Sequence, residues 1–437
     1  MSALLGRYFS SLQRLQPWRW SGQVVESVGQ TIESNGPLAS VGECCEVIDR
    51  YGLPHLAEVI GFRGSNVLSM PVETTEGIRF GDAVAALGYG PGIEVGPALM
   101  GRVLNAMGEP IDMLPKPEIE RSLPLEGAVR SPLDRTPIRQ PLGTGIRVLD
   151  SLLTVGRGQR VGIFGGSGVG KSTLIGMMTR NTEADVTVVG LVGERGREVG
   201  EFLEEALGEE GRKRSVVVVS TSDESPLKRV RAALSATTIA EYFAAQGKHV
   251  LLVLDSLTRY AMAAREIGLA AGEPPTAKGY TPSVFTKLAK LIERTGQFRT
   301  GSITAFYTVL MEGDDQQDPL VDAVRSLLDG HVVLSRQMAS EGWYPPIQVL
   351  DSISRLMPSV TEEAHRQQAA LVRKLLAVYA RSEDLVRIGA YKPGSDLDLD
   401  RAIRARTALR NFMTQDTRDE VHFRDSLQRL IALSTEI

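Results

Sequence analysis

The sequence predicts an α/β core built on a parallel sheet, with a small β-domain before it and a helical domain after it. Between about residues 146 and 360, apolar runs alternate with helical patterns, which is typical of a parallel sheet covered on both faces. A phosphate-binding pattern, G-x-x-x-x-G-K-[ST], follows the first of these runs. After residue 360, alternating charges and leucines predict helices packed together.

Composition places the chain among ordinary globular proteins. Its 437 residues are 42% hydrophobic and 23% charged, which suggests about three domains. The net charge of −4 argues against a protein that coats nucleic acid, and the absence of an 18-residue apolar run predicts no membrane-spanning segment. We expect the two cysteines, Cys44 and Cys45, to be buried and unpaired in a reducing compartment, because adjacent cysteines rarely form a disulfide.

Residues 1–20 form a short basic amphipathic segment. Leu5, Phe9, Leu12 and Leu15 recur at helical spacing among arginines, and no acidic residue occurs before Glu26. Four interpretations remain open from the residues alone: a helix that docks on a partner, a helix on a membrane surface, a mitochondrial transit peptide, and a solvated arm.

Residues 21–90 predict a small β-barrel or sandwich, because short apolar stretches alternate regularly with turn residues. The expected strands are Gln23–Val28, Glu43–Ile48, Leu56–Phe62, Asn66–Met70 and Asp82–Leu87. A passage rich in proline and glycine follows, up to about residue 145. It is too apolar to be disordered, so we expect an ordered connector with short strands at the start of a core domain that spans 91–360.

The core strands expected from continuous apolar runs are Arg160–Phe164, Val186–Val192, Ser215–Ser220, Val250–Leu254, Ile303–Val309 and His331–Leu334. In the last domain, 361–437, the helical pattern is clearest over Gln367–Tyr379 and Asp398–Asn411.

The phosphate-binding pattern lies between a predicted strand, Arg160–Phe164, and a predicted helix that begins at Thr173. Glycines let backbone N–H groups surround an oxyanion, and the helix adds its positive N-terminal end. Lys171 is expected to neutralise the β- and γ-phosphates, and Ser172 to place its hydroxyl on Mg²⁺. The predicted nucleotide-binding residues are therefore Gly165, Gly166, Ser167, Gly168, Val169, Gly170, Lys171, Ser172 and Thr173.

Three further charged residues are candidates for the chemistry. Asp255 ends the run Val250–Leu254, where a carboxylate would hold the Mg²⁺ of a nucleotide or, alternatively, cap the next helix. Glu194 follows another strand and would orient a water for attack, unless its charged run is only a surface ion-pair cluster. Arg355 is either an arginine finger offered to a neighbouring subunit or a structural arginine within its own subunit.

Five motifs together resemble the type III protein-export ATPases, which are relatives of the catalytic β subunit of rotary ATP synthase. The motifs are GGSGVGKS, GERGREV, VLLVLDSLTR, GSITAFYTVLMEGDD and LLDGHVVLSR. The resemblance runs from about residue 20 to the C-terminus and is strongest to the flagellar export ATPase, with the injectisome (virulence) homologue second. It implies an N-terminal β-barrel, a RecA-like nucleotide-binding core and a helical C-terminal domain that contacts cargo and chaperones.

The resemblance also implies roles for individual residues. Glu194 matches the catalytic glutamate, and Arg195 and Arg259 match arginines that line the phosphate site. Arg355 matches the arginine offered across the subunit interface. Tyr344 falls where an aromatic residue stacks on adenine, although Trp343 beside it offers a second aromatic ring.

The partners implied by the resemblance are those of an export motor in the cytoplasm at the inner face of the bacterial membrane. They are five further copies of the chain in a homo-hexamer, a regulator or stator protein on the N-terminal segment, a central stalk protein, export chaperone–cargo complexes and the secretion gate. The implied substrate is ATP with Mg²⁺. No nucleic-acid partner is expected. The chain lacks the acidic DELSEED-type run of synthase β subunits. The remaining alternatives are a synthase or ion-pump subunit, a scaffold that binds ATP without turnover, and a helicase-like translocase.

Overall fold

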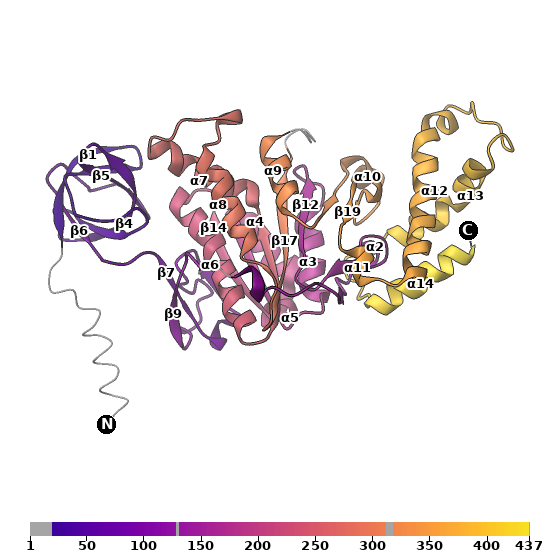
Figure 1. Ribbon diagram of the computed structural model, residues 1–437, viewed down its shortest axis with the longest axis horizontal. Coiled ribbons are helices and arrows are strands. Elements are labelled where there is room, and N and C mark those ends of the chain that lie inside the picture. Colours follow the sequence, from indigo (N-terminus) through magenta and orange to yellow (C-terminus); the bar gives the residue numbers. More distant parts are fainter. Residues whose placement is uncertain (1–19, 128–130, 312–317, 437) are drawn as a thin grey trace, which may run out of the picture.

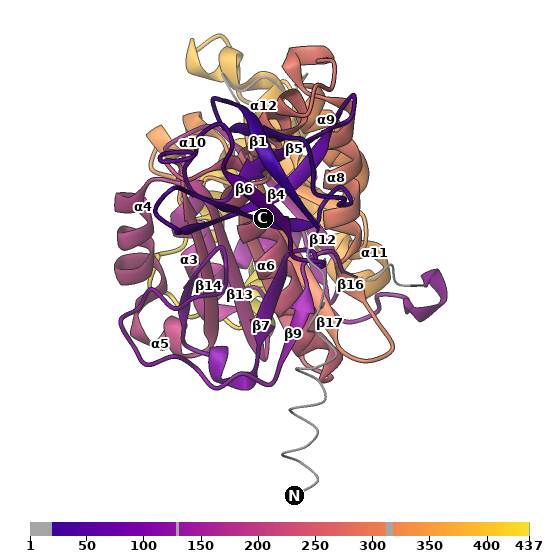
Figure 2. The same cartoon turned by 90° about the vertical axis from the view of Figure 1, so that its left-hand side faces the viewer.

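The computed structural model describes residues 20–127, 131–311 and 318–436, and arranges them as three units in a row (Figure 1). A β-barrel lies at one end, the nucleotide-binding core in the middle and a set of helices at the other end; Figure 2 views the molecule from the barrel end. The predicted amphipathic segment lies outside the described residues except for Trp20. The last four residues of one motif, EGDD at 312–315, also lie outside them.

The N-terminal unit is a closed antiparallel barrel with the strand order β1-β2-β5-β4-β3-β6. It confirms the five predicted strands and adds β2, which is short and runs into the turn that follows Ser34. Cys44 and Cys45 are buried and unpaired, as predicted. The strands are β1 (Ser21–Val28), β2 (Thr31–Ser34), β3 (Cys44–Ile48), β4 (Pro54–Arg63), β5 (Asn66–Pro71) and β6 (Ala83–Ala86).

The core contains a nine-stranded sheet with the order β19-β18-β12-β17-β15-β13-β14-β8, and β16 beside β17. The six predicted apolar strands are confirmed and run parallel. The connector contributes β8 to the outer edge of the sheet, which apolar periodicity over three residues did not reveal. The strands are β8 (Val103–Asn105), β12 (Arg160–Gly165), β13 (Val186–Glu194), β14 (Ser215–Thr221), β15 (His249–Asp255), β16 (Gly296–Gln297), β17 (Ser302–Leu310), β18 (Gly330–Val333) and β19 (Ile353–Ser354).

Helices cover both faces of this sheet. On β15, Leu252 and Leu254 pack into one buried cluster, whereas the alternating residues Leu251 and Val253 pack into the other. Because side chains alternate across a strand, apolar residues at every position require this double cover. The longer core helices are α3 (Lys171–Asn181), α6 (Pro226–Ala245), α7 (Leu257–Ala270), α8 (Pro282–Glu293) and α9 (Pro319–Leu327).

Shorter elements complete the core. The helical ones are α2 (Arg147–Leu152), α4 (Gly196–Glu201), the π-helical turn η3 (Phe202–Leu207), α5 (Gly208–Lys213), α10 (Arg336–Ser340) and α11 (Met357–Val360), with the 3₁₀ turns η1 (Pro97–Leu99), η2 (Pro132–Asp134), η4 (Ala277–Gly279) and η6 (Val349–Asp351). Two small strand pairs lie in the connector region and just after it: β7 (Gly92–Val95) with β9 (Arg121–Pro124), and β10 (Pro141–Leu142) with β11 (Val155–Gly156).

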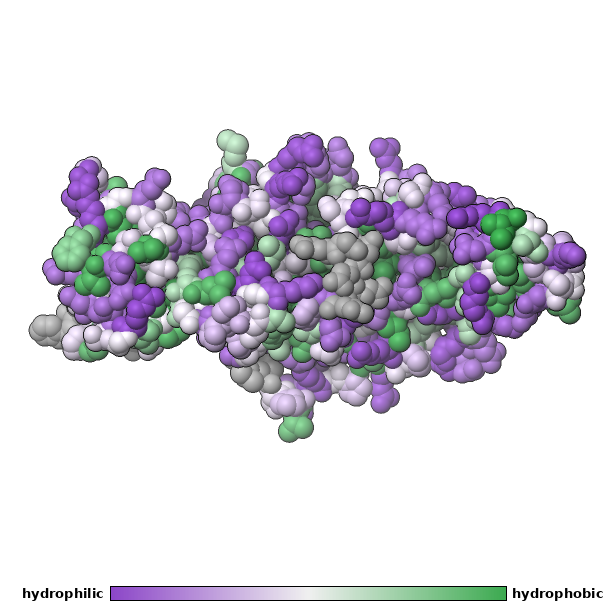
Figure 3. All heavy atoms as spheres, turned by 90° about the horizontal axis from the view of Figure 1, so that it is seen from above, coloured by the Kyte–Doolittle hydropathy of each residue, from purple (hydrophilic) through white to green (hydrophobic). Residues whose placement is uncertain are grey.

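The C-terminal unit consists of α12 (Glu363–Arg387), α13 (Leu397–Met413) and α14 (Phe423–Glu436). Within the described ranges, no helix combines the length and apolarity needed to span a bilayer. Leu385, Ile388 and Leu397 are exposed at the turn between α12 and α13, where Figure 3 shows apolar surface at the end of the molecule.

A buried arginine ties this unit to the core. The Nη1 of Arg147, in α2, donates to the carbonyl oxygens of Phe412 (2.9 Å) and Thr414 (3.0 Å) at the end of α13. Gln415 completes the junction: its Oε1 accepts from the Arg147 N–H at 2.9 Å, and its Nε2 donates to the Gly145 carbonyl at 2.8 Å. These bonds satisfy carbonyl groups that the end of a helix leaves without partners.

An ion pair joins the barrel to the core. Arg231 of α6 is only 2% exposed, and its Nη2 donates to Oε2 of Glu58, on β4, at 2.7 Å. Its Nη1 also lies 3.4 Å from the sulfur of Met107. A charge pair that is largely removed from water therefore helps to orient the barrel on the core.

We predict that R231M destabilises the protein by about 2–4 kcal/mol, because Glu58 is left partly buried without its cation. The double variant R231M/E58M removes both charges and should recover most of that loss in urea unfolding. A double variant as unstable as the single one would show that packing, rather than charge pairing, determines stability at this junction.

Candidate functional site

The phosphate loop, Gly165–Ser172, connects β12 to α3 at the carboxyl edge of the sheet. Gly168 (φ +75°) and Gly170 (φ +90°) adopt left-handed conformations that residues with a side chain rarely occupy. Val169 is buried and anchors the loop in the core. Ser172 is exposed in the first turn of the 11-residue helix α3, so the loop presents backbone N–H groups and a helix N-terminus, which suit an anion.

Lys171 folds back over this loop. Its Nζ donates to the carbonyl oxygens of Gly166 (2.5 Å) and Gly165 (3.2 Å), and the side chain is buried. Burial lowers the pKa of Lys171, while the negative charges of Asp255 and Glu194 act to raise it. The ammonium group is therefore held at the loop with two carboxylates facing it.

Asp255 ends β15 and is buried beside Lys171. The hydroxyl of Thr308 on β17 donates to its Oδ1 at 2.5 Å, and burial raises the pKa of its carboxyl group. The helix-capping alternative for Asp255 does not hold, because Ser256 caps α7 by accepting from the Arg259 N–H at 3.3 Å. The carboxylate is thus available to a ligand.

Glu194 ends β13, three strands away from the loop in the order β12-β17-β15-β13. Its pairing with β14 shifts register between Val192 and Glu194. Burial raises the pKa of Glu194 to about 8, aided by the charge of Asp255 and by a hydrogen bond with Glu198. The pKa of the Glu194 carboxyl group is therefore close to neutral pH, as a general base requires.

Arg259 of α7 contributes a cation to the same cluster. Its stem lies against Gly193, where a Cβ would come within 2.9 Å of the Arg259 Cβ, so position 193 admits no side chain without displacing the arginine. Its buried Nε has no hydrogen-bond partner among the described residues. Since buried donors are nearly always paired, this one fits an anionic group such as a phosphate.

The residues predicted to hold a metal also suit one. Ser172 and Asp255 offer a hydroxyl and a carboxylate, the hard oxygen donors that Mg²⁺ prefers. No group of three or more His, Cys, Asp or Glu side chains that could hold a metal occurs in the part of the chain that the structure describes. A hydroxyl and a carboxylate fit Mg²⁺ whose other ligands are substrate phosphates and water.

Of the other predicted arginines, Arg195 lies at the margin of the cluster and Arg355 lies far from it. The side chain of Arg195 is 76% exposed and lies 3.8 Å from Glu198 at the start of α4. Arg355 follows β19, and its N–H donates to the Asp329 carbonyl at 3.0 Å, at the amino edge of the sheet. At about 3.3 Å per residue, the length of β12 separates this edge from the phosphate loop by roughly 15–20 Å. Arg355 therefore does not reach the phosphate loop of its own chain.

The two aromatic candidates for adenine stacking are clearly separated. Cε1 of Tyr344 lies 3.7 Å from where a Cβ on Gly170 would be, and the ring is 45% exposed beside the phosphate loop. Trp343 instead packs against the buried cluster shared with the C-terminal helices. Of the two rings, only that of Tyr344 faces the candidate site.

Sequence reasoning assigned no role to two nearby charged residues. Glu198 shares a hydrogen bond with Glu194, and Arg336, exposed at the start of α10, contributes to the lowered pKa of Lys171. Glu198 belongs to the same charged run as Glu194, and this closeness in sequence could have indicated that it lies near the site. For Arg336 the signal was its position just after a predicted strand, His331–Leu334, which turned out to lie beside β12.

Family models match three parts of the chain. The ATP synthase alpha/beta family nucleotide-binding domain matches residues 145–354, and the beta-barrel domain of the same family matches residues 24–88. The T3SS EscN ATPase C-terminal domain matches residues 361–432.

Relatives match over nearly the full length. The flagellum-specific ATP synthase of Treponema pallidum is 54% identical over 434 residues, which cover 99% of this chain and 97% of the relative. The type 3 secretion system ATPase of Xanthomonas euvesicatoria is 46% identical and covers 97% of this chain and 96% of its own length. The solved structure of assembled EscN from enteropathogenic E. coli is similar with a TM-score of 0.90 at 44% identity, covering 94% of this chain and all of that one.

The raised pKa of Glu194 predicts a pH-dependent effect on stability. Folding favours its protonated form, so this contribution is complete below about pH 4.5 and is lost as pH rises toward 8. The glutamine of E194Q stays neutral at every pH. Without nucleotide, the free energy of unfolding of E194Q should therefore exceed that of the wild type, and the difference should grow between pH 5.5 and 8.5. After discounting for partial exposure, we expect on the order of 1–2 kcal/mol at the upper end.

Thermal unfolding at several pH values measures this margin. E204Q is the matched control, because Glu204 is exposed on the neighbouring segment and should show no growing margin. A constant or shrinking margin for E194Q would contradict the assignment of Glu194 to a desolvated site.

Proposed function

This chain belongs to the flagellar and type III secretion ATPases of the ATP synthase alpha/beta family, and we propose that it hydrolyses ATP to assist the export of flagellar proteins. The observation that supports this most directly is the convergence of Lys171, Glu194, Asp255 and Arg259 at the carboxyl edge of one sheet, next to a phosphate loop.

We assign the chemistry as follows. The phosphate loop and Lys171 hold the β- and γ-phosphates, and Arg259 approaches them from α7. Glu194 orients a water for in-line attack on the γ-phosphate and polarises it. Ser172 and Asp255 would hold Mg²⁺, which supplies charge neutralisation of the phosphates and favours ionised carboxylates. Tyr344 stacks on the adenine.

The position of Arg355 supports a site completed by a neighbouring subunit. It lies at the opposite edge of the sheet from the phosphate loop, and in the described residues its guanidinium makes no hydrogen bond or ion pair. A ring built by head-to-tail contacts places opposite faces of like subunits together. We therefore propose a homo-hexamer in which Arg355 of one subunit stabilises charge at the site of the next, with Arg195 at the rim of that site.

The partners follow from the relatives. EscN, whose solved structure in complex with its central stalk EscO has a TM-score of 0.87 and 43% identity to this chain, suggests a stalk protein in the centre of the ring. We propose that the exposed apolar turn between α12 and α13 and the adjoining helices contact the stalk or chaperone–cargo complexes, that the N-terminal segment binds a regulator, and that the assembly works in the cytoplasm at the secretion gate.

The alternatives differ in how well they agree with these findings. The match to a type III secretion C-terminal domain over residues 361–432 disfavours a rotary synthase subunit. Injectisome ATPases remain the second candidate, because the type 3 secretion ATPase encoded by SPI-2 in Salmonella typhimurium is 49% identical over 92% of this chain. The flagellar relatives reach 54% over 99%.

Hydrolysis itself is tested by K171A. Loss of the ammonium group that neutralises the phosphates should lower steady-state ATP turnover by at least about a hundredfold. The control is K213A, because Lys213 is a surface residue paired with Glu209 and Glu210. Near-wild-type turnover in K171A would refute the assignment.

The trans role of Arg355 is tested by mixing two inactive variants. R355A and E194Q homo-oligomers should each lose about 10³-fold or more in turnover. In random mixtures at equal amounts, up to about a quarter of the sites pair an intact Glu194 with a neighbour's intact Arg355, so activity should partly return. Mixtures as inactive as their components would place Arg355 in a role within its own subunit.

A further inference from the structure

The segment Glu341–Pro345 carries Tyr344 to the phosphate loop, yet part of its support comes from the C-terminal domain. The backbone N–H of Gln415, just after α13, donates to the Tyr344 carbonyl at 2.7 Å. Gln415 is itself fixed by its side-chain bonds to Arg147 of α2 and to Gly145, just before that helix. The position of the Tyr344 ring thus depends on where α13 ends.

Arg410 makes a second link from α13 to the same segment. Its Nη2 donates to the Glu341 carbonyl at 2.8 Å, and its guanidinium lies over the Trp343 ring at 5.5 Å from the centroid. Both distances are those of favourable contacts, a charge-assisted hydrogen bond and a cation–π interaction. The Arg410 side chain therefore contacts both neighbours of Gly342, which are Glu341 and Trp343. Trp343 directly precedes Tyr344.

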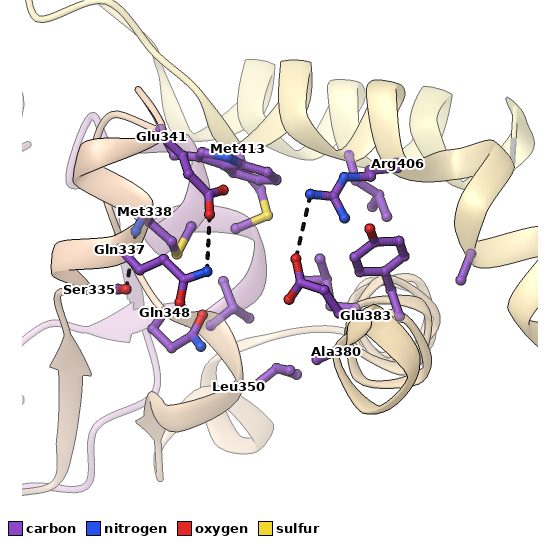
Figure 4. A pocket seen from close by; sticks show the side chains of 16 residues that line it. Ser335, Gln337, Met338, Glu341, Gln348, Leu350, Ala380, Glu383, Arg406 and Met413 are labelled. Carbon is purple, nitrogen blue, oxygen red and sulfur yellow. Dashed lines mark hydrogen bonds and ion pairs between the residues drawn. The ribbon is translucent and has the colours of Figure 1, made fainter. Parts of the chain in front are cut away.

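A hollow lies beside this link. A cleft of about 150 Å³ separates α10 and η6 from α12 and α13, and Trp343, Leu376, Tyr379 and Met413 help to line it. In Figure 4, Glu341 and Met338 of the core lie across this cleft from Arg406 and Glu383 of the helices. A space of this size can hold a small organic molecule, so the residues of the segment that line it are not closely packed against the helices on that side.

We infer that Arg410 is a positioning residue of the nucleotide site, which sets the place of Tyr344 from the C-terminal domain. The inference rests on the proposed function, because it assumes that Tyr344 stacks on a nucleotide base. Loss of the Arg410 contacts moves the stacking surface, whereas the phosphate loop stays attached to β12, which is paired on both sides within the sheet. A protein that binds the C-terminal helices would thereby change ATP affinity, and ATP would change the affinity of that protein by the same factor.

Two ligands separate the base from the phosphates: ATP and inorganic triphosphate, each titrated with Mg²⁺ into the full chain. R410A should weaken ATP binding about threefold to tenfold. This is less than the full worth of one charge-assisted hydrogen bond and one cation–π contact, because only the part that holds Tyr344 in its stacking position acts on ATP. Affinity for inorganic triphosphate should stay at the wild-type value, since the ligand has no base to meet Tyr344. R410K can still donate to the Glu341 carbonyl, so its affinity for ATP should lie between those of R410A and the wild type.

Arg406 provides the matched control. It lies one turn earlier on the same helix, but its guanidinium stacks on Tyr379 at 4.0 Å and lies 3.8 Å from Glu383, both within the helical domain. R406A should therefore leave ATP affinity unchanged. Y344A should weaken ATP binding by itself, and R410A/Y344A should bind no worse than Y344A.

Three results would overturn the inference. Wild-type ATP affinity in R410A excludes a positioning role, and equal weakening of ATP and inorganic triphosphate indicates general damage to the site. Additive losses in R410A/Y344A show that Arg410 does not act through Tyr344. If the wild-type protein binds neither ligand, the proposed function fails together with the inference, whereas normal wild-type binding with an unaffected R410A rejects the inference alone.

Discussion

The burial of one parallel sheet on both faces is the constraint on which the rest of this molecule depends. Because helices cover both sides of β12, β13 and β15, these strands carry apolar residues at nearly every position, and charged groups emerge only where the strands end. Lys171, Glu194 and Asp255 come together at that edge for this reason. The same edge holds the N-terminus of α3, so the fold concentrates charges and oriented N–H groups in one place.

That concentration has an electrostatic consequence. Burial favours the neutral forms of Asp255, Glu194 and Lys171 alike. The attraction between Lys171 and the carboxylates favours the charged forms, whereas the charge of Asp255 further raises the pKa of Glu194. A polyanion with its cation would offset the burial cost of these groups, which gives a physical reason for the cluster to bind a metal–nucleotide complex. Arg259, whose buried Nε has no partner among the residues that the structure describes, belongs to the same balance. The site is therefore built for a ligand rather than for stability.

The chain by itself holds only part of the proposed catalytic apparatus. Arg355 is exposed at the opposite edge of the sheet, and the carbonyl of Tyr344 accepts from the backbone N–H of Gln415, just after α13. Catalysis in this arrangement depends on two relations between rigid units: the contact between neighbouring subunits and the junction between the core and α13. Binding of another protein at either contact can change the geometry of the nucleotide site, since domain and subunit contacts are the usual elements of allosteric transitions.

The sequence by itself determined the fold class, six core strands, five barrel strands and the phosphate loop, because each rests on local periodicity or on a motif with a fixed spacing. It also indicated Glu194 and Asp255 through their positions at strand ends. Only the tertiary structure showed that Ser256 rather than Asp255 caps α7, that Tyr344 rather than Trp343 faces the loop, and that Arg355 lies at the far edge. These three features depend on which strands become neighbours and on how side chains pack. Neither produces a periodic pattern in the sequence. Short strands such as β2 and β8 were missed for a related reason: three or four residues carry too little pattern, and the sheet they join supplies their stability.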